Sequence, residues 1–340
     1  MKKLAKITFG LLGGFLISLA ILAGIAYVLT DAEYQVAKTV ADDPSIAHIE
    51  VNSVKLHAET FGDKMNPPVV VLHGGPGNDY RMLLPLKELA DEFYLIFYDQ
   101  RGTGLSERVA AERITVDSYF DDLGSVIDHF APGRNVHIIG HSWGAMLGSG
   151  FTARNPGRVD KLVLSEPGFL NPALGKEFAT KLRPKSAAKF AWALGSMFFR
   201  ALHVEGPDEQ AWLDYIVVQI MESKESDADP TAGYYCGDDV STGSMPFWRP
   251  GAVAAYSAQT APTNEQGEPD IDLVAGIEKW PGTALFLAGE CNRLIGQKWQ
   301  EENHLPLYPR AQMTVIPGSG HTMFGERPVE VNAAIRAYLR

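Results

Sequence analysis

The sequence predicts an α/β fold with a mostly parallel sheet covered by helices on both faces, and three observations support this prediction. Short, continuous apolar runs alternate with amphipathic stretches, as in a parallel sheet that is buried on both sides. A glycine-serine-glycine turn stands between one apolar run and the helix predicted after it. The alternation breaks once, over about residues 168–280, where aromatic residues and helix formers dominate. This break predicts a helical cap inserted after one core strand.

The predicted strands are short apolar segments that end in polar or glycine-containing turns. They are a hairpin over 49–61 and the runs 69–72, 93–98, 136–139, 162–164, 284–288 and 313–316. Amphipathic stretches over 80–90, 116–130 and 328–339 are predicted helices. Strands and helices that alternate in this way join through right-handed crossovers. The resulting division is an anchor or signal segment over 1–30, a core over 31–167 and 281–340, and the cap over 168–280.

The composition is that of an ordinary folded protein. The chain has 340 residues, of which 46% are hydrophobic and 21% are charged, and this balance excludes a disordered chain. The formal net charge of −11 argues against a nucleic-acid partner, because such a partner requires a basic face. The two cysteines have no histidines at matching spacing, so no zinc site is predicted. We expect no metal and no organic cofactor, and the sequence leaves the oligomeric state open.

The N-terminal segment predicts a transmembrane helix. Lys2, Lys3 and Lys6 precede an almost uncharged stretch over 7–30, and a helix needs roughly 20 apolar residues to cross a bilayer. The lysines should stay in the cytoplasm, which makes the rest of the chain extracytoplasmic. A cleaved signal peptide is the alternative, and small residues near Gly24-Ile25-Ala26 weakly support it. We therefore expect a membrane-anchored protein, or a secreted or periplasmic one after cleavage.

The two cysteines allow two interpretations. Cys236 lies in the predicted cap, and Cys291 follows a core strand near the expected site. Outside the cytoplasm such a pair can oxidise, and the bond would tie the cap to the core. Two separate, partly buried thiols are equally compatible with the sequence.

A candidate nucleophile lies in the segment Gly140-His141-Ser142-Trp143-Gly144. The segment follows the apolar run 136–139 and precedes a predicted helix over 145–154. The turn from strand to helix is so tight that only glycines fit beside the serine, whose hydroxyl is held out at the end of the strand. We predict that Ser142 is the nucleophile of an acyl-transfer reaction.

The candidate base is His321. It follows the last core strand in the glycine-rich loop 317–323, so its ring can reach back to Ser142. A serine needs such a base because its hydroxyl is a weak nucleophile until it loses its proton. By contrast, His73 and His141 belong to turns, and packing or hydrogen bonding is their predicted role.

The oxyanion of the reaction needs backbone N–H donors aimed at one point. One predicted donor is Trp143, the residue after the nucleophile. The other is Gly75, in the loop His73-Gly74-Gly75-Pro76-Gly77, where glycines let the backbone approach closely.

Three motifs together resemble the proline iminopeptidase branch of the α/β-hydrolase fold. They are His73-Gly74-Gly75-Pro76-Gly77, Asp99-Gln100-Arg101-Gly102-Thr103-Gly104-Leu105-Ser106 and Gly140-His141-Ser142-Trp143-Gly144. The resemblance covers most of 45–170 and 280–340, and the cap matches only in being helical and in its place. It implies an aminopeptidase that releases N-terminal residues from small peptides. A carboxylesterase or lactonase is the alternative, and a non-catalytic binding protein on this scaffold is the second.

At the position of the triad acid, this sequence differs from the usual pattern of that family. The family usually has an aspartate three residues after the glycine that ends the penultimate strand, and Asn292 stands there instead. An amide cannot stabilise the imidazolium that forms when serine loses its proton. We favour Glu166, after the strand that follows the nucleophile helix, over Glu290. A weakened triad with Asn292, or an inactive protein, is the remaining explanation.

The cap is acidic and aromatic. From Glu205 to Asp239 it holds ten Asp or Glu residues against Lys224 alone, which fits a pocket that pairs with the ammonium group of a peptide. A solvated surface is the alternative for any one of these residues, so no single specificity residue is predicted. The aromatic residues of the cap could line an apolar pocket, but they are expected mainly to build the cap's own small core. They include Trp192, Trp212, Tyr234, Tyr235 and Trp248.

Overall fold

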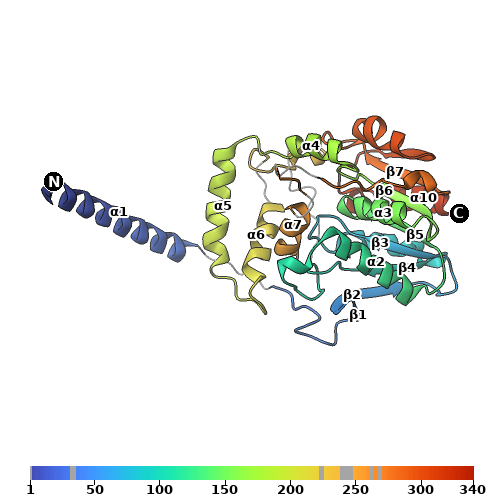
Figure 1. Ribbon diagram of the computed structural model, residues 1–340, viewed down its shortest axis with the longest axis horizontal. Coiled ribbons are helices and arrows are strands. Elements are labelled where there is room, and N and C mark those ends of the chain that lie inside the picture. The colour runs from blue at the N-terminus through green and yellow to red at the C-terminus, as the bar shows by residue number, and fades with distance from the viewer. Residues whose placement is uncertain (1, 31–35, 222–225, 238–247, 261–262, 266–269) are drawn as a thin grey trace.

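The computed structural model describes residues 2–30, 36–221, 226–237, 248–260, 263–265 and 270–340 (Figure 1). Within these residues, eight strands form one sheet in the order β1-β2-β4-β3-β5-β6-β7-β8. The strands are β1 (His48–Val51), β2 (Val54–Phe61), β3 (Pro68–Leu72), β4 (Tyr94–Tyr98), β5 (Val136–His141), β6 (Val159–Ser165), β7 (Thr283–Gly289) and β8 (Ala311–Ile316). β2 pairs antiparallel with β1 and β4, and the remaining pairs are parallel. The predicted mostly parallel sheet is confirmed.

Helices cover both faces of this sheet. They are η1 (Tyr80–Asp91), η2 (Ala111–Arg113), α2 (Val116–Phe130), α3 (Trp143–Arg154), η5 (Ile277–Lys279), α8 (Gln297–Trp299), η6 (Gln300–His304), η7 (Leu305–Leu307), α9 (Met323–Glu326) and α10 (Pro328–Leu339). The side chains of β3 point alternately to the two faces of the sheet. Val70 and Leu72 pack with α2 and α3, while Val69 and Val71 pack with η1 and α10. All five β3 residues are buried. A strand covered on both faces has no position for a polar residue, which explains its continuous apolar run.

The register of the sheet brings the functional loops together. Leu72 of β3 pairs with Gly140 of β5, and Ser165 of β6 pairs with both His141 of β5 and Leu287 of β7. Parallel strands in register end at the same edge of a sheet. The segments that follow β3, β5, β6 and β7 therefore leave the sheet side by side, and ligands bind at this edge in open α/β sheets.

The chain leaves the sheet after β6 and returns to it at β7. The intervening helices are α4 (Pro172–Lys181), α5 (Ala187–Ala201), α6 (Ala211–Met221), η3 (Ala232–Tyr234) and α7 (Ala252–Thr260). In Figure 1, α5, α6 and α7 stand beyond one end of the sheet, and α4 lies above it. We refer to this insertion as the cap.

A buried ion network connects the cap to the core. The Arg249 guanidinium, which has no exposed surface, donates to both carboxylate oxygens of Asp208 at 2.7 Å and to Asp214 at 2.7 Å. Arg108 of the core also donates to Asp214, at 3.3 Å. Buried charges are tolerated when each has a partner of opposite sign and its hydrogen bonds are made. This network fixes α6 against the segment that enters α7.

The N-terminal helix α1 (Lys2–Leu29) projects away from the rest of the molecule (Figure 1). Its window Leu12–Leu29 has a mean hydropathy of 2.3 and is 0% buried. A helix of this length and composition is a candidate membrane span, and a signal sequence has the same properties.

One expectation about the cap is wrong. Trp192 is 82% exposed and Trp212 is 38% exposed, so Trp192 does not belong to a cap core. The physical reason is that α5 is apolar around much of its circumference, and its inner side alone packs against α6. Of the predicted cap aromatics, Tyr234 and Tyr235 do enter a buried cluster, together with Ile295.

A disulfide joins Cys236 of the cap to Cys291 of the core, with 4.8 Å between the Cα atoms. Of the two interpretations that the sequence allowed, the structure contains the bond. The bond closes a loop that spans 55 positions of the sequence. It therefore links the segment after η3 directly to the loop that follows β7.

We expect the oxidised protein, denatured without reductant, to contain no free thiol. Replacing both cysteines, as Cys236→Ser and Cys291→Ser, should lower the free energy of unfolding by about 2–4 kcal/mol, because the unfolded chain regains the freedom that the bond removes. Thiol titration and denaturant unfolding of the double variant measure these two quantities. Two reactive thiols in the unreduced wild-type protein would contradict the structure.

Candidate active site

Ser142 occupies a strained turn between β5 and α3. Its backbone angles are φ 54° and ψ −118°, in a region that residues other than glycine rarely adopt. A Cβ on Gly144 would lie 2.1 Å from the carbonyl oxygen of Leu72, and one on Gly140 would lie 2.4 Å from that of Gly144. The two glycines of the motif are therefore required by close backbone approach. The Ser142 hydroxyl makes no hydrogen bond to any described residue, and Ser142 lines a cavity beneath the cap.

The structure brings the predicted base and the favoured acid together. His321 Nδ1 lies 2.6 Å from Glu166 Oε2. Glu166 is fully buried and adopts φ 44°, which turns its side chain from the end of β6 toward the loop that carries His321. His321 and Ser142 line the same cavity. With Nδ1 engaged by Glu166, Nε2 is the ring nitrogen that remains for a proton transfer.

Two further donors hold the Glu166 carboxylate. Its Oε1 accepts from the backbone N–H of Gly289 at 2.7 Å, and its Oε2 accepts from Asn292 Nδ2 at 2.8 Å. The orientation of the Asn292 amide follows from its other contacts, because its Oδ1 accepts from the backbone N–H groups of Leu294 and Ile295, each at 3.0 Å. Asn292 thus acts as a donor to the acid and does not replace it.

The competing carboxylate, Glu290, points elsewhere. Its Oε2 accepts from the backbone N–H of Gly318 at 2.8 Å, at an exposed position. This contact keeps Glu290 on the surface and away from the hydrogen bond between His321 and Glu166.

The two predicted oxyanion donors belong to segments that lie next to Ser142. Gly74 approaches so closely that a Cβ there would lie 3.0 Å from Ser142 Cβ, and Gly75 follows with φ 120°. Trp143 begins α3, so its N–H has no partner within the helix. Neither the Gly75 nor the Trp143 N–H donates to a described group. Free N–H groups beside a serine at a helix N-terminus suit a developing negative charge.

Gln100 fixes these two elements relative to each other. Its Nε2 donates to the carbonyl of His73 at 2.9 Å, and its Oε1 accepts from the Trp143 indole at 2.9 Å. The next residue, Arg101, forms a buried ion pair in which its guanidinium donates to both carboxylate oxygens of Asp122. The motif therefore positions the oxyanion loop without lining the cavity.

His73 and His141 are buried, as expected for structural residues. Burial lowers the pKa of both rings below the ordinary histidine value, so both are neutral at neutral pH. His73 Nε2 accepts from the backbone N–H of Gln100 at 3.0 Å. His141 Nδ1 contacts Ser165 Oγ at 3.2 Å.

Tyr234 of the cap lines the cavity and also contacts His321, and the sequence did not reveal this contact. Its ring stacks on that of His321 with 4.3 Å between centroids, and its carbonyl accepts from the His321 N–H at 2.8 Å. His141 lies on His321 as well, with 4.5 Å between ring centroids. The cap thus helps to fix the imidazole, and the disulfide at Cys236 lies two residues beyond Tyr234.

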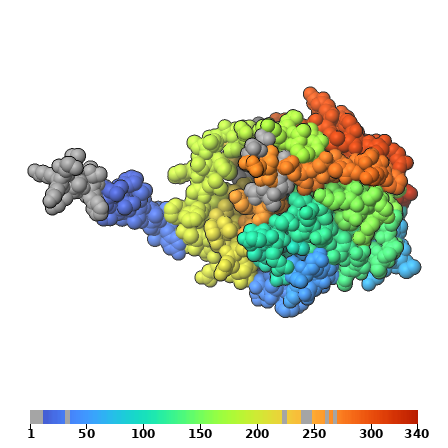
Figure 2. Space-filling view, in the orientation of Figure 1, coloured from blue at the N-terminus to red at the C-terminus, as the bar shows by residue number. Residues whose placement is uncertain are grey.

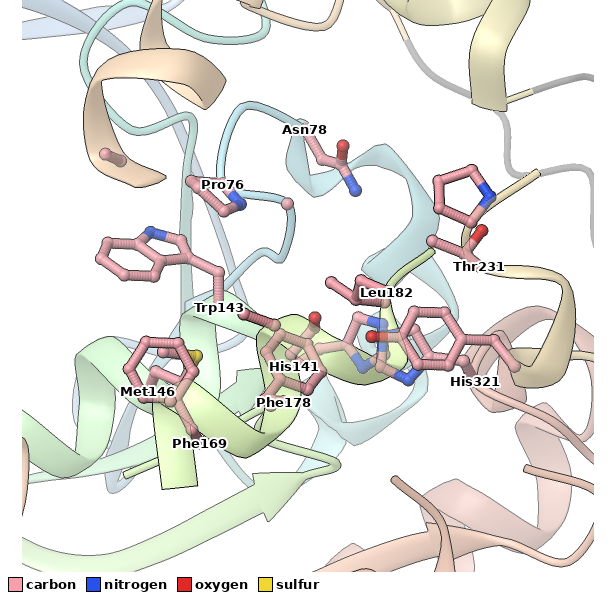
Figure 3. Close-up of a pocket in the computed structure, with 18 of the residues that line it drawn as sticks. Pro76, Asn78, His141, Trp143, Met146, Phe169, Phe178, Leu182, Thr231 and His321 are labelled. Carbon is pink, nitrogen blue, oxygen red and sulfur yellow. The ribbon is translucent and has the colours of Figure 1, made fainter. Parts of the chain in front are cut away.

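The cavity has a volume of about 330 Å³ and is predominantly apolar (Figure 3). Its described apolar walls include Met146, Phe169, Phe178, Leu182, Ile220 and Ile271. Figure 3 shows Trp143, Met146 and Phe169 at one side of this space, Phe178 near its middle, and Thr231 and His321 at the other side. The apolar walls would therefore contact the part of an acyl group that lies away from the reacting carbonyl.

Asp229 is the single carboxylate among the described residues that line the cavity. It is 4% exposed, its Oδ1 accepts from the N–H and hydroxyl of Thr231 at 2.7 Å each, and its Oδ2 has no partner. Burial raises the pKa of this carboxyl above the usual aspartate value. The acidic composition of the cap was the only signal for it in the sequence, and composition does not select one of ten residues. Some of the ten, including Glu222, Glu225, Asp238 and Asp239, lie outside the described residues.

Known proteins resemble this chain in family and in fold. A family model described as alpha/beta hydrolase family matches residues 69–334. The chain is 38% identical over 106 residues to the proline iminopeptidase of Heyndrickxia coagulans, which is 31% of this chain and 36% of that protein. It is 32% identical over 119 residues to the cis-3-alkyl-4-alkyloxetan-2-one decarboxylase of Shewanella oneidensis, 34% of this chain and 37% of that protein. The matched stretch is little more than a third of the length of these relatives.

Solved structures share the fold over most of the chain. The proline iminopeptidase of Mycobacterium smegmatis matches 86% of this chain and 97% of its own with a TM-score of 0.56 at 22% identity. An enzyme described as degrading N-acyl homoserine lactones matches 86% of this chain and all of its own with a TM-score of 0.57 at 21% identity. At these identities the likeness shows the fold alone.

We expect Glu166→Gln to lower kcat far more than Asn292→Ala. Loss of the carboxylate should cost on the order of 10³–10⁴-fold, as the equivalent change does in a serine protease. Loss of the Asn292 amide removes one hydrogen bond to the acid and should cost about tenfold. Steady-state kinetics of the two variants measure the difference, with Glu290→Gln as a matched control that retains wild-type kcat. A larger loss in Asn292→Ala than in Glu166→Gln would refute the assignment of the acid.

Proposed function

Because the chain belongs to the alpha/beta hydrolase family, we propose that it is a serine hydrolase that acts by acyl transfer. The observation that carries this proposal is the convergence of Ser142, the hydrogen-bonded pair of His321 and Glu166, and two free backbone N–H groups around one cavity. Nucleophile, base, acid and oxyanion donors are the parts that acyl transfer by serine requires.

In the proposed mechanism, Ser142 Oγ attacks the carbonyl carbon of the substrate while His321 Nε2 takes its proton. Glu166 stabilises the imidazolium through Nδ1, and the N–H groups of Gly75 and Trp143 hold the oxyanion. The tetrahedral intermediate collapses as His321 returns the proton to the leaving group. Water then attacks the acyl-enzyme, again with His321 as base. This step releases the carboxylic acid formed from the acyl group and regenerates Ser142.

We propose an aminopeptidase of proline iminopeptidase type as the specific activity. Asp229 supports it, because a buried carboxylate with one unpartnered oxygen in the cavity can pair with the ammonium group of an N-terminal residue. The apolar walls suit a proline ring or a small aliphatic side chain. Similarity to proline iminopeptidases over a third of the chain agrees with this assignment.

A carboxylesterase or lactonase is the second candidate. The apolar lining of the cavity favours it, since Phe169, Phe178 and Leu182 can accept an acyl chain that carries no charge. Burial, which raises the pKa of Asp229, favours the neutral carboxyl that an uncharged acyl chain requires beside it.

We further propose that α1 is an uncleaved anchor and that the catalytic domain is extracytoplasmic. The lysines before the apolar stretch support this orientation. The disulfide between Cys236 and Cys291 supports it too, because such bonds persist in oxidising compartments. Cleavage of a signal peptide would give a secreted or periplasmic protein with the same domain.

We expect detergent-solubilised full-length protein to hydrolyse prolyl or alanyl arylamides with a free amine, and N-blocked analogues much more slowly. Because burial raises the pKa of Asp229, the KM for the free-amine substrate should fall as pH rises through that pKa and the carboxyl ionises. Asp229→Asn should raise that KM by about 10–100-fold, the equivalent of one charge-assisted hydrogen bond, and abolish this pH dependence. Kinetics against pH, with the exposed Glu209→Gln as control, measure both effects.

Turnover of a short-chain aryl ester alone, unaffected by Asp229→Asn, would overturn the aminopeptidase in favour of the esterase. Absence of turnover, together with no labelling of folded protein by a fluorophosphonate probe, would overturn the catalytic proposal and leave a binding protein. Labelling should be stoichiometric and should disappear in Ser142→Ala.

A further inference from the structure

The outward side of α5 is apolar, although a surface helix normally turns polar residues to water. The exposed apolar residues recur at the spacing of one helix face: Ala188, Ala191, Trp192, Gly195, Phe198 and Leu202, the last just beyond the helix. Trp192 is 82% exposed, Leu202 48% and Phe198 45%. We call these six residues the α5 face. Large apolar side chains gathered on one exposed face indicate a surface that another apolar medium covers.

The segment that contains this face is basic in an acidic protein. Residues 172–202 hold six basic residues and one acidic residue, Glu177, whereas the whole chain has a net charge of −11. The basic residues are Lys176, Lys181, Arg183, Lys185, Lys189 and Arg200. Lys189 pairs with Asp227 at 2.9 Å, on the surface. Aromatic and aliphatic side chains beside lysines and arginines are the composition of helices that lie on anionic membranes.

The end of α5 contacts the candidate membrane span itself. His203, two residues after α5, stacks on Tyr27 of α1 with 4.1 Å between ring centroids, and its Nε2 lies 2.9 Å from the Tyr27 carbonyl oxygen. Tyr27 lies near the end of the apolar window Leu12–Leu29, and aromatic residues at that position mark the membrane–water interface. The C-terminal end of α5 is therefore within side-chain contact of that interface if α1 crosses the bilayer.

The arrangement of α1 and α5 would allow the membrane surface to contact α5 along its whole length. In Figure 1, α5 stands at the side of the domain nearest α1 and runs crosswise to it. Figure 2 shows the yellow-green and yellow atoms of this part of the cap as the end of the domain from which the blue helix projects. A helix crosswise to a membrane span lies parallel to the membrane plane.

From these observations we infer that the α5 face docks on the surface of a phospholipid bilayer containing anionic lipids. This inference rests on the proposal that α1 anchors the chain. The apolar side chains enter the boundary between headgroups and acyl chains, and the exposed basic residues of the segment, such as Lys185 and Arg200, meet lipid phosphates. Docking has a consequence for the site, because Leu182 lines the cavity and the basic residues Arg183 and Lys185 follow it directly. Substrates that partition into the membrane would meet the cavity at its membrane-proximal wall.

The test places a fluorescent probe on the α5 face of the full-length protein in proteoliposomes of phosphatidylcholine and phosphatidylglycerol. Both native cysteines are in the disulfide, so Trp192→Cys and Phe198→Cys each supply one free thiol for labelling. Met65→Cys is the matched control, because Met65 lies outside the cap, between β2 and β3, and its side chain is 84% exposed. Lipids brominated on the acyl chain should quench the probes at 192 and 198 by about half, as for side chains at the acyl boundary, and leave the probe at 65 unquenched.

Two readouts separate this inference from the anchoring proposal. Resistance of the protein to alkaline extraction reports on α1, and quenching reports on the α5 face. Membrane-retained protein without quenching at 192 and 198 overturns the docking and leaves the anchor. If the probes are quenched but alkali extracts the protein from the membrane, docking is supported and the anchor is overturned. A blue-shifted probe that brominated lipid does not quench indicates burial against a second copy or another protein, and it also overturns the docking.

Discussion

The proposed catalytic arrangement depends on one buried hydrogen bond, between Glu166 Oε2 and His321 Nδ1 at 2.6 Å. Glu166 sits at the end of β6 in a left-handed conformation, and its carboxylate gathers donors from three segments. They are the imidazole after β8, the Gly289 N–H at the end of β7 and the Asn292 amide just beyond it. A buried carboxylate is tolerated only when such donors are present. The acid therefore orients the base and also holds together the loops at this edge of the sheet.

The cap completes the same arrangement from the opposite side. Tyr234 stacks on His321, and the disulfide between Cys236 and Cys291 fastens the segment that carries Tyr234 to the loop that carries Asn292. Ser142 and the loop that contains Gly75 belong to the core, whereas the surface that holds the His321 ring is shared with the cap. Movement of this part of the cap would therefore change the position of the base as well as the shape of the cavity.

The parts of this structure that were predictable are those encoded locally. Apolar runs such as 69–72 marked the parallel strands because a strand buried on both faces admits no polar residue. Ser142 and Gly75 could be proposed as site residues from the sequence because tight turns leave a glycine pattern. The acid could be ranked but not assigned, because Glu166, Glu290 and Asn292 differ in long-range contacts that spacing does not encode.

The cap was predicted only in outline, because it follows no repeated pattern of strands and helices. Asp229 and Tyr234 act through contacts with distant segments, and one acidic or aromatic residue among many carries no local signal. Trp192 was assigned to a cap core on the general rule that large apolar residues are buried. Its exposure beside a candidate membrane span is the kind of exception that marks a surface with a partner.

Proton NMR of the full-length protein in detergent tests the central hydrogen bond most directly. A proton held between an imidazole and a carboxylate resonates well downfield of the amide region, and two such protons are expected, at His321 with Glu166 and at His57 with Asp99, the latter pair at 2.8 Å. Glu166→Gln should remove the first resonance and retain the second, which reports an intact fold, while Asn292→Ala should retain both. Two unchanged downfield resonances in folded Glu166→Gln would contradict the assignment of Glu166 as the acid.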